Sequence, residues 1–207
     1  MKVILVNGSP HKEGCTCTGL REVEKALNAA GIETEILWIG SDPIRGCIGC
    51  GSCAKLGKCF DDSDIVNKFA KKAASADGFV FGTPVHYAAA GGAITSFMDR
   101  VFYSGKSGLA GKPAAVIVSC RRGGASAAFD ELNKYFTINS MPIVSSQYWN
   151  QVHGNTPEEV MQDEEGMQTM RTLGKNMAWL IKCIELGKQN GIEIPPQEAK
   201  ITTNYIR

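Results

Sequence analysis

The sequence predicts an α/β protein, a doubly wound three-layer sandwich around a five-stranded parallel sheet. Two observations lead to this prediction. Short apolar runs rich in Val and Ile recur along the chain, and stretches with helical periodicity separate them. Such runs are typical of parallel strands buried on both faces, and the alternation favours right-handed crossovers. The strands are expected at residues 2–6, 34–39, 78–81, 114–119 and 143–148.

The helices follow from the apolar spacing between these strands. The stripe that begins at Leu20 belongs to a helix expected at 19–30, and Gly31 ends it. Residues 61–74 open with three aspartates and a serine, a typical helix N-terminus. Further helices are expected at 92–103, 125–136 and 164–187.

The length of 207 residues favours a single domain, which we expect at 1–187. A cysteine-rich loop, 40–60, interrupts its alternation of strands and helices. The polar segment 147–163 is expected to be a long surface excursion. The remaining tail, 188–207, is expected to wrap the surface or to form an oligomer contact.

The charge and hydropathy of the chain exclude two classes of partner. Lys and Arg number 22 and Asp and Glu 21, a net charge of +1, which argues against a nucleic-acid binder. No apolar run approaches the roughly 20 residues needed to span a bilayer, and the N-terminus lacks the apolar stretch of a signal peptide. We therefore expect a cytoplasmic protein with neither a nucleic-acid nor a membrane partner.

The loop after the first strand combines hydroxyl groups, a basic pair (His11 and Lys12) and the start of a helix. It matches neither the dinucleotide fingerprint nor the P-loop. A helix N-terminus attracts anions, because unpaired N–H groups and the helix dipole point at them, so this loop favours a terminal phosphate. The alternative is an ordinary turn whose Ser and Thr cap the helix. The candidate phosphate contacts are Ser9, His11, Cys15, Thr16, Cys17 and Thr18.

The segments Gly8-Ser9-Pro10-His11 and Gly14-Cys15-Thr16 resemble the phosphate loop of the flavodoxin-like NAD(P)H-dependent FMN reductase family. Two later segments agree with that family, GTPVHY at 82–87 and FMDR at 97–100. The resemblance implies a flavodoxin-like fold with strand order 2-1-3-4-5. It also implies FMN at the switch point between strands one and three, NAD(P)H as co-substrate, and a homodimer or homotetramer.

The resemblance assigns the loop after the third strand to the isoalloxazine ring of FMN. This loop contains Pro84, Val85, His86 and Tyr87. His86 stands where the family usually has Tyr, so its side chain either contacts the flavin or points to solvent.

The loop after the fourth strand is expected at the same edge of the sheet. Arg121 is the candidate to stabilise the negative charge of reduced flavin near N1 and O2. Arg122 is the candidate for the NADPH 2′-phosphate; the alternative is that both are surface arginines. The candidate cofactor contacts in this loop are Ser119, Arg121, Gly123 and Gly124.

Four cysteines lie within thirteen positions of the chain: Cys47, Cys50, Cys53 and Cys59. In a reducing compartment such spacing favours metal binding or free thiols over disulfides. The pattern resembles the cysteine loop of the iron-sulfur flavoprotein branch of the same family, which implies a [4Fe-4S] cluster. Zinc and free thiols remain the alternatives.

These features predict an FMN-dependent oxidoreductase. Electrons would pass from NAD(P)H to a small acceptor, directly or through a [4Fe-4S] cluster. No single catalytic residue is expected, because the flavin supplies the chemistry. One alternative is an electron carrier, either similar to flavodoxin or an iron-sulfur flavoprotein with a protein redox partner. The other alternative is a redox-sensing module. Oligomer contacts are expected at 88–93 and at Tyr148 and Trp149.

Overall fold

The computed structural model of the chain describes residues 1–207 except 197, 200, 204, 206 and 207. Its centre is a parallel sheet of five strands in the order β2-β1-β3-β5-β6, to which the short strand β4 adds an antiparallel pair with the end of β3. The strands are β1 (Lys2–Asn7), β2 (Glu33–Trp38), β3 (Gly78–His86), β4 (Ala89–Ala90), β5 (Ala114–Cys120) and β6 (Gln151–His153). Without β4, this is the expected order 2-1-3-4-5.

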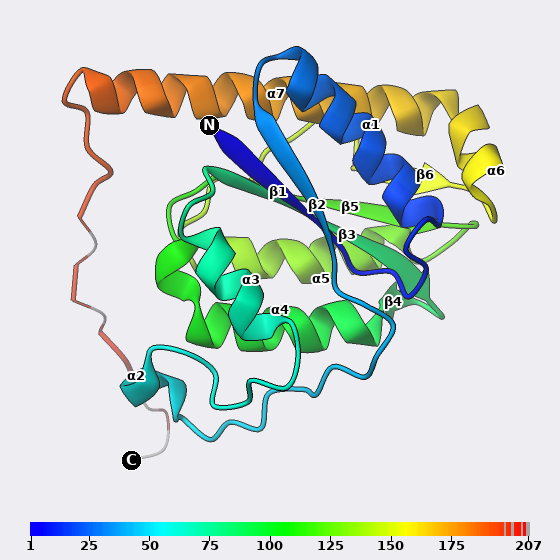
Figure 1. Cartoon of the computed structure of the whole chain (residues 1–207). Coiled ribbons are helices and arrows are strands. Elements are labelled where there is room, and N and C mark those ends of the chain that lie inside the picture. Colours follow the sequence, from blue (N-terminus) through cyan, green and yellow to red (C-terminus); the bar gives the residue numbers. More distant parts are fainter. Residues whose placement is uncertain (197, 200, 204, 206–207) are drawn as a thin grey trace.

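Helices cover both faces of the sheet, as a doubly wound fold requires (Figure 1). One face carries α1 (Cys15–Ala29) and α7 (Glu164–Gln189), and the other carries α3 (Val66–Ala73), α4 (Gly92–Ser104) and α5 (Ala125–Thr137). The short elements are α2 (Cys53–Leu56), α6 (Pro157–Gln162) and a turn of 3-10 helix at Lys106–Gly108. The predicted fold class is therefore confirmed.

The alternation of side chains along β1 divides the core into two halves. Val3 and Leu5 pack toward α1 and α7, whereas Ile4 and Val6 pack toward α3, α4 and α5, as the two-residue period of a strand dictates. The second half is rich in aromatic rings: Phe69 lies 5.1 Å from Phe97 between ring centroids, in an edge-on arrangement that aromatic pairs favour.

The position predicted for the fifth strand, 143–148, is wrong. Ile143 forms a single bridge to Ala114, and the chain then turns before β6 begins at Gln151, eight residues after the predicted start. The turn is held by Asn150, which is buried and donates from its side chain to the carbonyl of Val116 at 3.0 Å. The predicted excursion at 147–163 consequently contains both β6 and α6.

Two helix starts also differ from the prediction. Helix α1 begins at Cys15, four residues earlier than expected, and α3 begins at Val66, five residues later. The acidic residues before α3 form turns instead, with Asp61 accepting from the backbone N–H of Ser63 at 3.0 Å. The predictions at 92–103, 125–136 and 164–187 are confirmed to within two residues.

Helix α7 ends at Gln189, just inside the predicted tail, and five positions of that tail lie outside the described residues. Within the described part of the chain, no helix is both long and apolar enough to cross a membrane.

Candidate functional site

The loops after β1, β3 and β5 meet at one edge of the sheet (Figure 1). The backbone N–H of Gly8 donates to the carbonyl of Gly82 at 2.9 Å, which joins the first loop to β3. A hydrogen bond of 2.7 Å between the buried hydroxyls of Thr16 and Ser119 joins the start of α1 to the end of β5. The convergence expected from the strand order is therefore present.

Close backbone approach completes this junction at Gly124. A Cβ added there would lie 2.7 Å from Cγ1 of Val85, and the residue has a φ of +87°. Both facts require glycine. The loop after β5 consequently lies directly against the end of β3.

The first turn of α1 has unpaired backbone N–H groups. Its N-cap, Gly14, has no side chain to cap the helix, and the backbone N–H groups of Thr16 and Cys17 make no hydrogen bond to any described residue. The alternative, in which Ser and Thr side chains cap the helix, is not observed: the Thr16 hydroxyl bonds to Ser119, and the Thr18 hydroxyl donates to the Gly14 carbonyl at 3.3 Å. Unpaired N–H groups at the positive end of a helix fit a phosphate.

Two residues missed in the sequence analysis, Asn7 and Trp38, hold the loop that faces α1. The buried Asn7 side chain accepts from the N–H of Ser9 at 3.0 Å and donates to the carbonyl of Lys12 at 3.0 Å. The Trp38 indole donates to the carbonyl of Ser9 at 2.8 Å. An Asn directly after a strand is a known turn signal, whereas the Trp38 contact depends on tertiary structure. The side chain of Ser9 accepts from the N–H of His11, which is exposed.

The loop after β3 is a tight hairpin into β4. His86 pairs with Ala89, so Tyr87 and Ala88 form the turn. Tyr87 has a φ of +56°, a conformation that bulky residues rarely adopt and that often marks a ligand site. Its ring and the His86 imidazole are both exposed, while Pro84 and Val85 are half-buried. The hairpin therefore presents a flat aromatic side chain at the edge of the site.

The loop after β5 contains Arg121, Arg122 and Gly123, all exposed. Neither arginine forms an ion pair with a residue that the structure describes. Gly124 is the N-cap of α5 and, like Gly14, supplies no side-chain cap. This edge therefore offers two exposed guanidinium groups beside a second open helix end, which suits an anionic ligand.

The three cysteines near this edge are structural in character. Burial raises the pKa of the thiols of Cys15, Cys17 and Cys120. A thiol with a raised pKa is uncharged at neutral pH and is a poor nucleophile. Cys15 and Cys17 can therefore contribute to a phosphate site through their backbone N–H groups and not through sulfur.

The four cysteines of loop 40–60 surround one cavity of about 480 Å³. Cys47 and Cys50 are exposed, and Cys53 and Cys59 are half-buried. Hydrogen bonds from Ser52 lower the pKa of the Cys50 thiol. Within the ranges the structure describes, no three Cys, His, Asp or Glu side chains converge on one point as a single metal ion requires. The four cysteines line one shared cavity instead.

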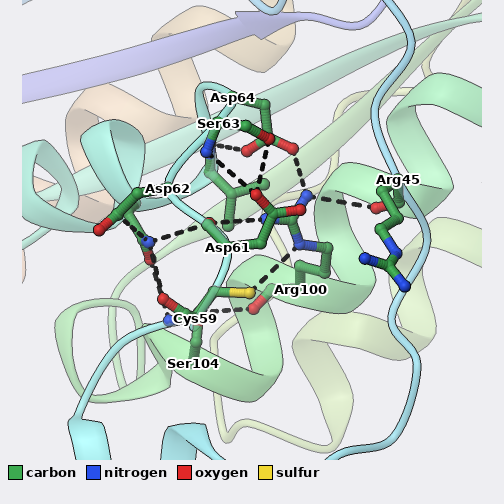
Figure 2. A network of polar contacts seen from close by, with 10 residues as sticks. Arg45, Cys59, Asp61, Asp62, Ser63, Asp64, Arg100 and Ser104 are labelled. Atoms are coloured by element: carbon green, nitrogen blue, oxygen red, sulfur yellow. Dashed lines mark hydrogen bonds and ion pairs between the residues drawn. The ribbon is translucent and has the colours of Figure 1, made fainter.

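Arg100 on α4 lines this cavity and lies at the centre of a network of polar contacts (Figure 2). Its side chain is only 3% exposed, and its Nε donates to the sulfur of Cys59 at 3.3 Å. Its Nη1 forms an ion pair with Asp64, and its Nη2 donates to the carbonyl of Asp61 at 3.0 Å. The Asp-rich segment that the sequence suggested as a helix start is therefore a binding partner of Arg100.

Helix α4 connects the two regions. Ile94 packs against the loop after β1, where a Cβ added at Gly8 would lie 2.7 Å from it. Arg100, six residues later, reaches Cys59, and six residues of helix span about 9 Å. Helix α4 thus contacts both the loop after β1 and the cysteine cavity.

Comparison with known proteins identifies the family that the chain matches. Residues 1–156 match the family described as NADPH-dependent FMN reductase. An iron-sulfur flavoprotein from Methanocaldococcus jannaschii is 32% identical over 195 residues, covering 89% of this chain and 100% of its own length. One from Archaeoglobus fulgidus is 30% identical over 175 residues, with coverage of 83% and 86%.

Solved structures confirm the fold at lower identity. RosB with bound 8-demethyl-8-formylriboflavin-5'-phosphate has a TM-score of 0.72 at 14% identity and covers 100% of this chain and 94% of its own. The NAD(P)H:quinone oxidoreductase from Methanothermobacter marburgensis has a TM-score of 0.62 at 16% identity, with coverage of 86% and 96%. At these identities the likeness concerns the fold alone.

Proposed function

The chain belongs to the NADPH-dependent FMN reductase family and is a flavodoxin-like, FMN-dependent oxidoreductase; from this premise we propose that it passes electrons from NAD(P)H to a small acceptor such as a quinone, a free flavin, or an azo or nitro compound. One observation supports the proposal most: three loops converge at an uncapped helix end that fits the FMN phosphate. FMN, when bound, supplies the hydride acceptor and the site of electron transfer.

The chain's own residues bind and orient the ligands in this proposal. The backbone N–H groups of Thr16 and Cys17 bind the phosphate, because they are unpaired at the positive end of α1. The hairpin at Tyr87 orients the ring. Arg121 places a positive charge where the reduced ring carries negative charge, and Arg122 binds a 2′-phosphate through its two-pronged guanidinium.

We further propose that Cys47, Cys50, Cys53 and Cys59 hold a [4Fe-4S] cluster. The donor set fits, because four thiolates are the usual ligands of such a cluster. The cavity is also compatible with a cluster, because each of the four cysteines would bind a different iron and the thiols would therefore need to line a shared volume. Zinc would require all four sulfurs around a single ion. Two relatives whose names say iron-sulfur flavoprotein support the cluster.

A second candidate function is electron transfer to a redox protein, favoured by the cysteine cavity next to the flavin site. The acceptor would then dock on the exposed cysteine loop, and turnover with small acceptors would be slow.

A homodimer or homotetramer is proposed for either function. The exposed Tyr148 and Trp149 support a contact there, whereas Ala90 and Gly91 of the 88–93 segment are buried and support local packing.

Steady-state turnover distinguishes the two functions. The FMN-loaded protein is mixed anaerobically with NADPH or NADH and with menadione, and nicotinamide oxidation is followed by absorbance. A reductase consumes the nicotinamide many times over. Bound FMN that is reduced once, without turnover on any of the small acceptors, would identify an electron carrier; failure to bind FMN would overturn both functions.

A further inference from the structure

Cys59 differs from the other three cysteines of its loop because the fold holds it in place. The side chain of Asn67, on α3, donates to the carbonyl of Cys59 at 2.9 Å and accepts from its N–H at 3.0 Å. Arg100, on α4, donates to its sulfur at 3.3 Å. Two helices thus fix both the main chain and the sulfur of this residue, whereas Cys47 and Cys50 lie on an exposed loop.

The contact between Arg100 and Cys59 is unusual for a buried cation. The guanidinium directs its other N–H groups to strong acceptors, namely the carboxylate of Asp64 and the carbonyls of Arg45 and Asp61. A neutral thiol is a weak acceptor, so the Nε–H of a buried guanidinium gains little from it. A sulfur that ligates a metal carries negative charge and makes a much stronger acceptor.

We propose that Arg100 is a positioning residue for the cysteine loop: it holds the sulfur of Cys59 in place as a ligand and tunes the reduction potential of the bound cluster. This inference rests on the proposed cluster. Hydrogen bonds to ligand sulfurs stabilise the more negative, reduced state and so raise the potential. Partners of this kind change metal affinity by about 10–100-fold when they are removed.

The variant Arg100→Lys tests the tuning. A lysine keeps the charge and can pair with Asp64, but its single ammonium group cannot serve Asp64 and the Cys59 sulfur together. The matched control is Arg45→Gln, which removes a positive charge from the wall of the same cavity without a contact to sulfur. Thermal unfolding and FMN affinity show that each variant is folded.

The reduction midpoint of the cluster is measured by an EPR-monitored titration of anaerobically loaded protein. Arg100→Lys is expected to change the ratio of reduced to oxidised cluster roughly tenfold in favour of the oxidised state. This corresponds to a midpoint potential about 59 mV more negative for one electron. Arg45→Gln is expected to shift the midpoint potential far less. An unchanged midpoint in Arg100→Lys, or an equal shift in Arg45→Gln, overturns the inference.

A second variant covers the case in which Arg100→Lys does not fold. Asn67→Ser releases the main chain of Cys59 and leaves Arg100 intact. We expect it to lose iron to a chelator about tenfold faster than the wild type; an equal rate overturns the role of Cys59 as the fixed ligand. A wild-type chain that takes up no iron and sulfide overturns the proposed cluster itself, whereas loaded wild type with unaffected variants overturns only the inference.

Discussion

The open end of α1 and the cysteine cavity differ in how completely the fold prepares them for a ligand. At α1, buried hydroxyls, a buried asparagine and close glycine contacts fix every loop before any ligand binds. At the cysteine cavity Cys59 is held by side chains of α3 and α4, whereas two of the other thiols lie on an exposed loop. A rigid, pre-formed site loses little entropy on binding. The cysteine loop, in contrast, is expected to gain order when the proposed cluster binds, so that the cluster would contribute to the stability of the fold.

The largest expected effect concerns the fixed cysteine. Cys59→Ser removes the ligand that the fold holds in place and should abolish stable iron loading while FMN binding remains. Iron and acid-labile sulfide are counted on anaerobically reconstituted protein. The matched control is Cys183→Ser, an exposed cysteine on α7 outside the loop, which should load fully. Full loading of Cys59→Ser would contradict the account.

The next prediction concerns a negative charge introduced at the N-terminus of α1. Cys15→Asp places a carboxylate in the first turn, where it should stabilise the helix by about 0.5 kcal/mol and weaken FMN binding roughly 100-fold through like-charge repulsion. Cys15→Asn is the neutral control of the same shape. Fluorescence titration measures FMN affinity, and thermal unfolding measures stability. Equal FMN affinity in the two variants would show that the phosphate binds elsewhere.

Apolar periodicity predicted the alternation of strands and helices, whereas the family resemblance implied the sheet order. The convergence of the loops followed from that order, because ligands bind at the carboxyl ends of parallel strands. The sequence did not predict the start of α1. The stretch Cys15-Thr16-Cys17-Thr18 has low helix propensity, and its helical conformation is stabilised by the tertiary contact of Thr16 with Ser119. For the same reason β6 was misplaced: the composition of 143–148 is more strand-like than that of Gln151–His153, and the burial of Asn150 decides the register.

The cysteine region shows a second limit of sequence analysis. The spacing identified the four thiols but gave no sign that Arg100 reaches Cys59, since 41 positions separate them. Likewise, the aspartates before α3 resembled helix caps until the structure showed Arg100 between them. Local patterns name the residue types, whereas contacts between distant segments decide their roles.

A smaller effect on FMN affinity is expected when an exposed aromatic side chain is removed. Tyr87→Ala removes the exposed ring of the hairpin and should weaken FMN binding roughly tenfold, the scale of an aromatic pair. Tyr103→Ala, an exposed aromatic on α4 at the cysteine cavity, should leave FMN binding unchanged. Both affinities come from calorimetric titration with FMN. The assignment of the hairpin to the flavin ring fails if Tyr103→Ala has the larger effect.

The smallest effect involves Glu22, on the face of α1 away from both sites. Burial raises the pKa of its carboxyl, but hydrogen bonds from Arg171 and Lys25 outweigh burial, so the pKa lies below the ordinary 4.5. The ionised carboxylate therefore stabilises the fold above about that pH, and this stabilisation disappears as the pH falls through the lowered pKa.

Glu22→Gln should lower the free energy of unfolding by about 1 kcal/mol at pH 7, measured by urea denaturation. The difference from the wild type should vanish in acid, and FMN affinity should not change. A difference that grew on acidification would contradict the ion pair with Arg171.

The phosphate contact at α1 is the central claim, and comparison of two ligands tests it most directly. The affinities of FMN and riboflavin, which differ only in the phosphate, are measured on the same metal-free protein. Because unpaired N–H groups meet the phosphate, FMN should bind at least about 100-fold more tightly. Equal affinities for the two flavins would contradict the account.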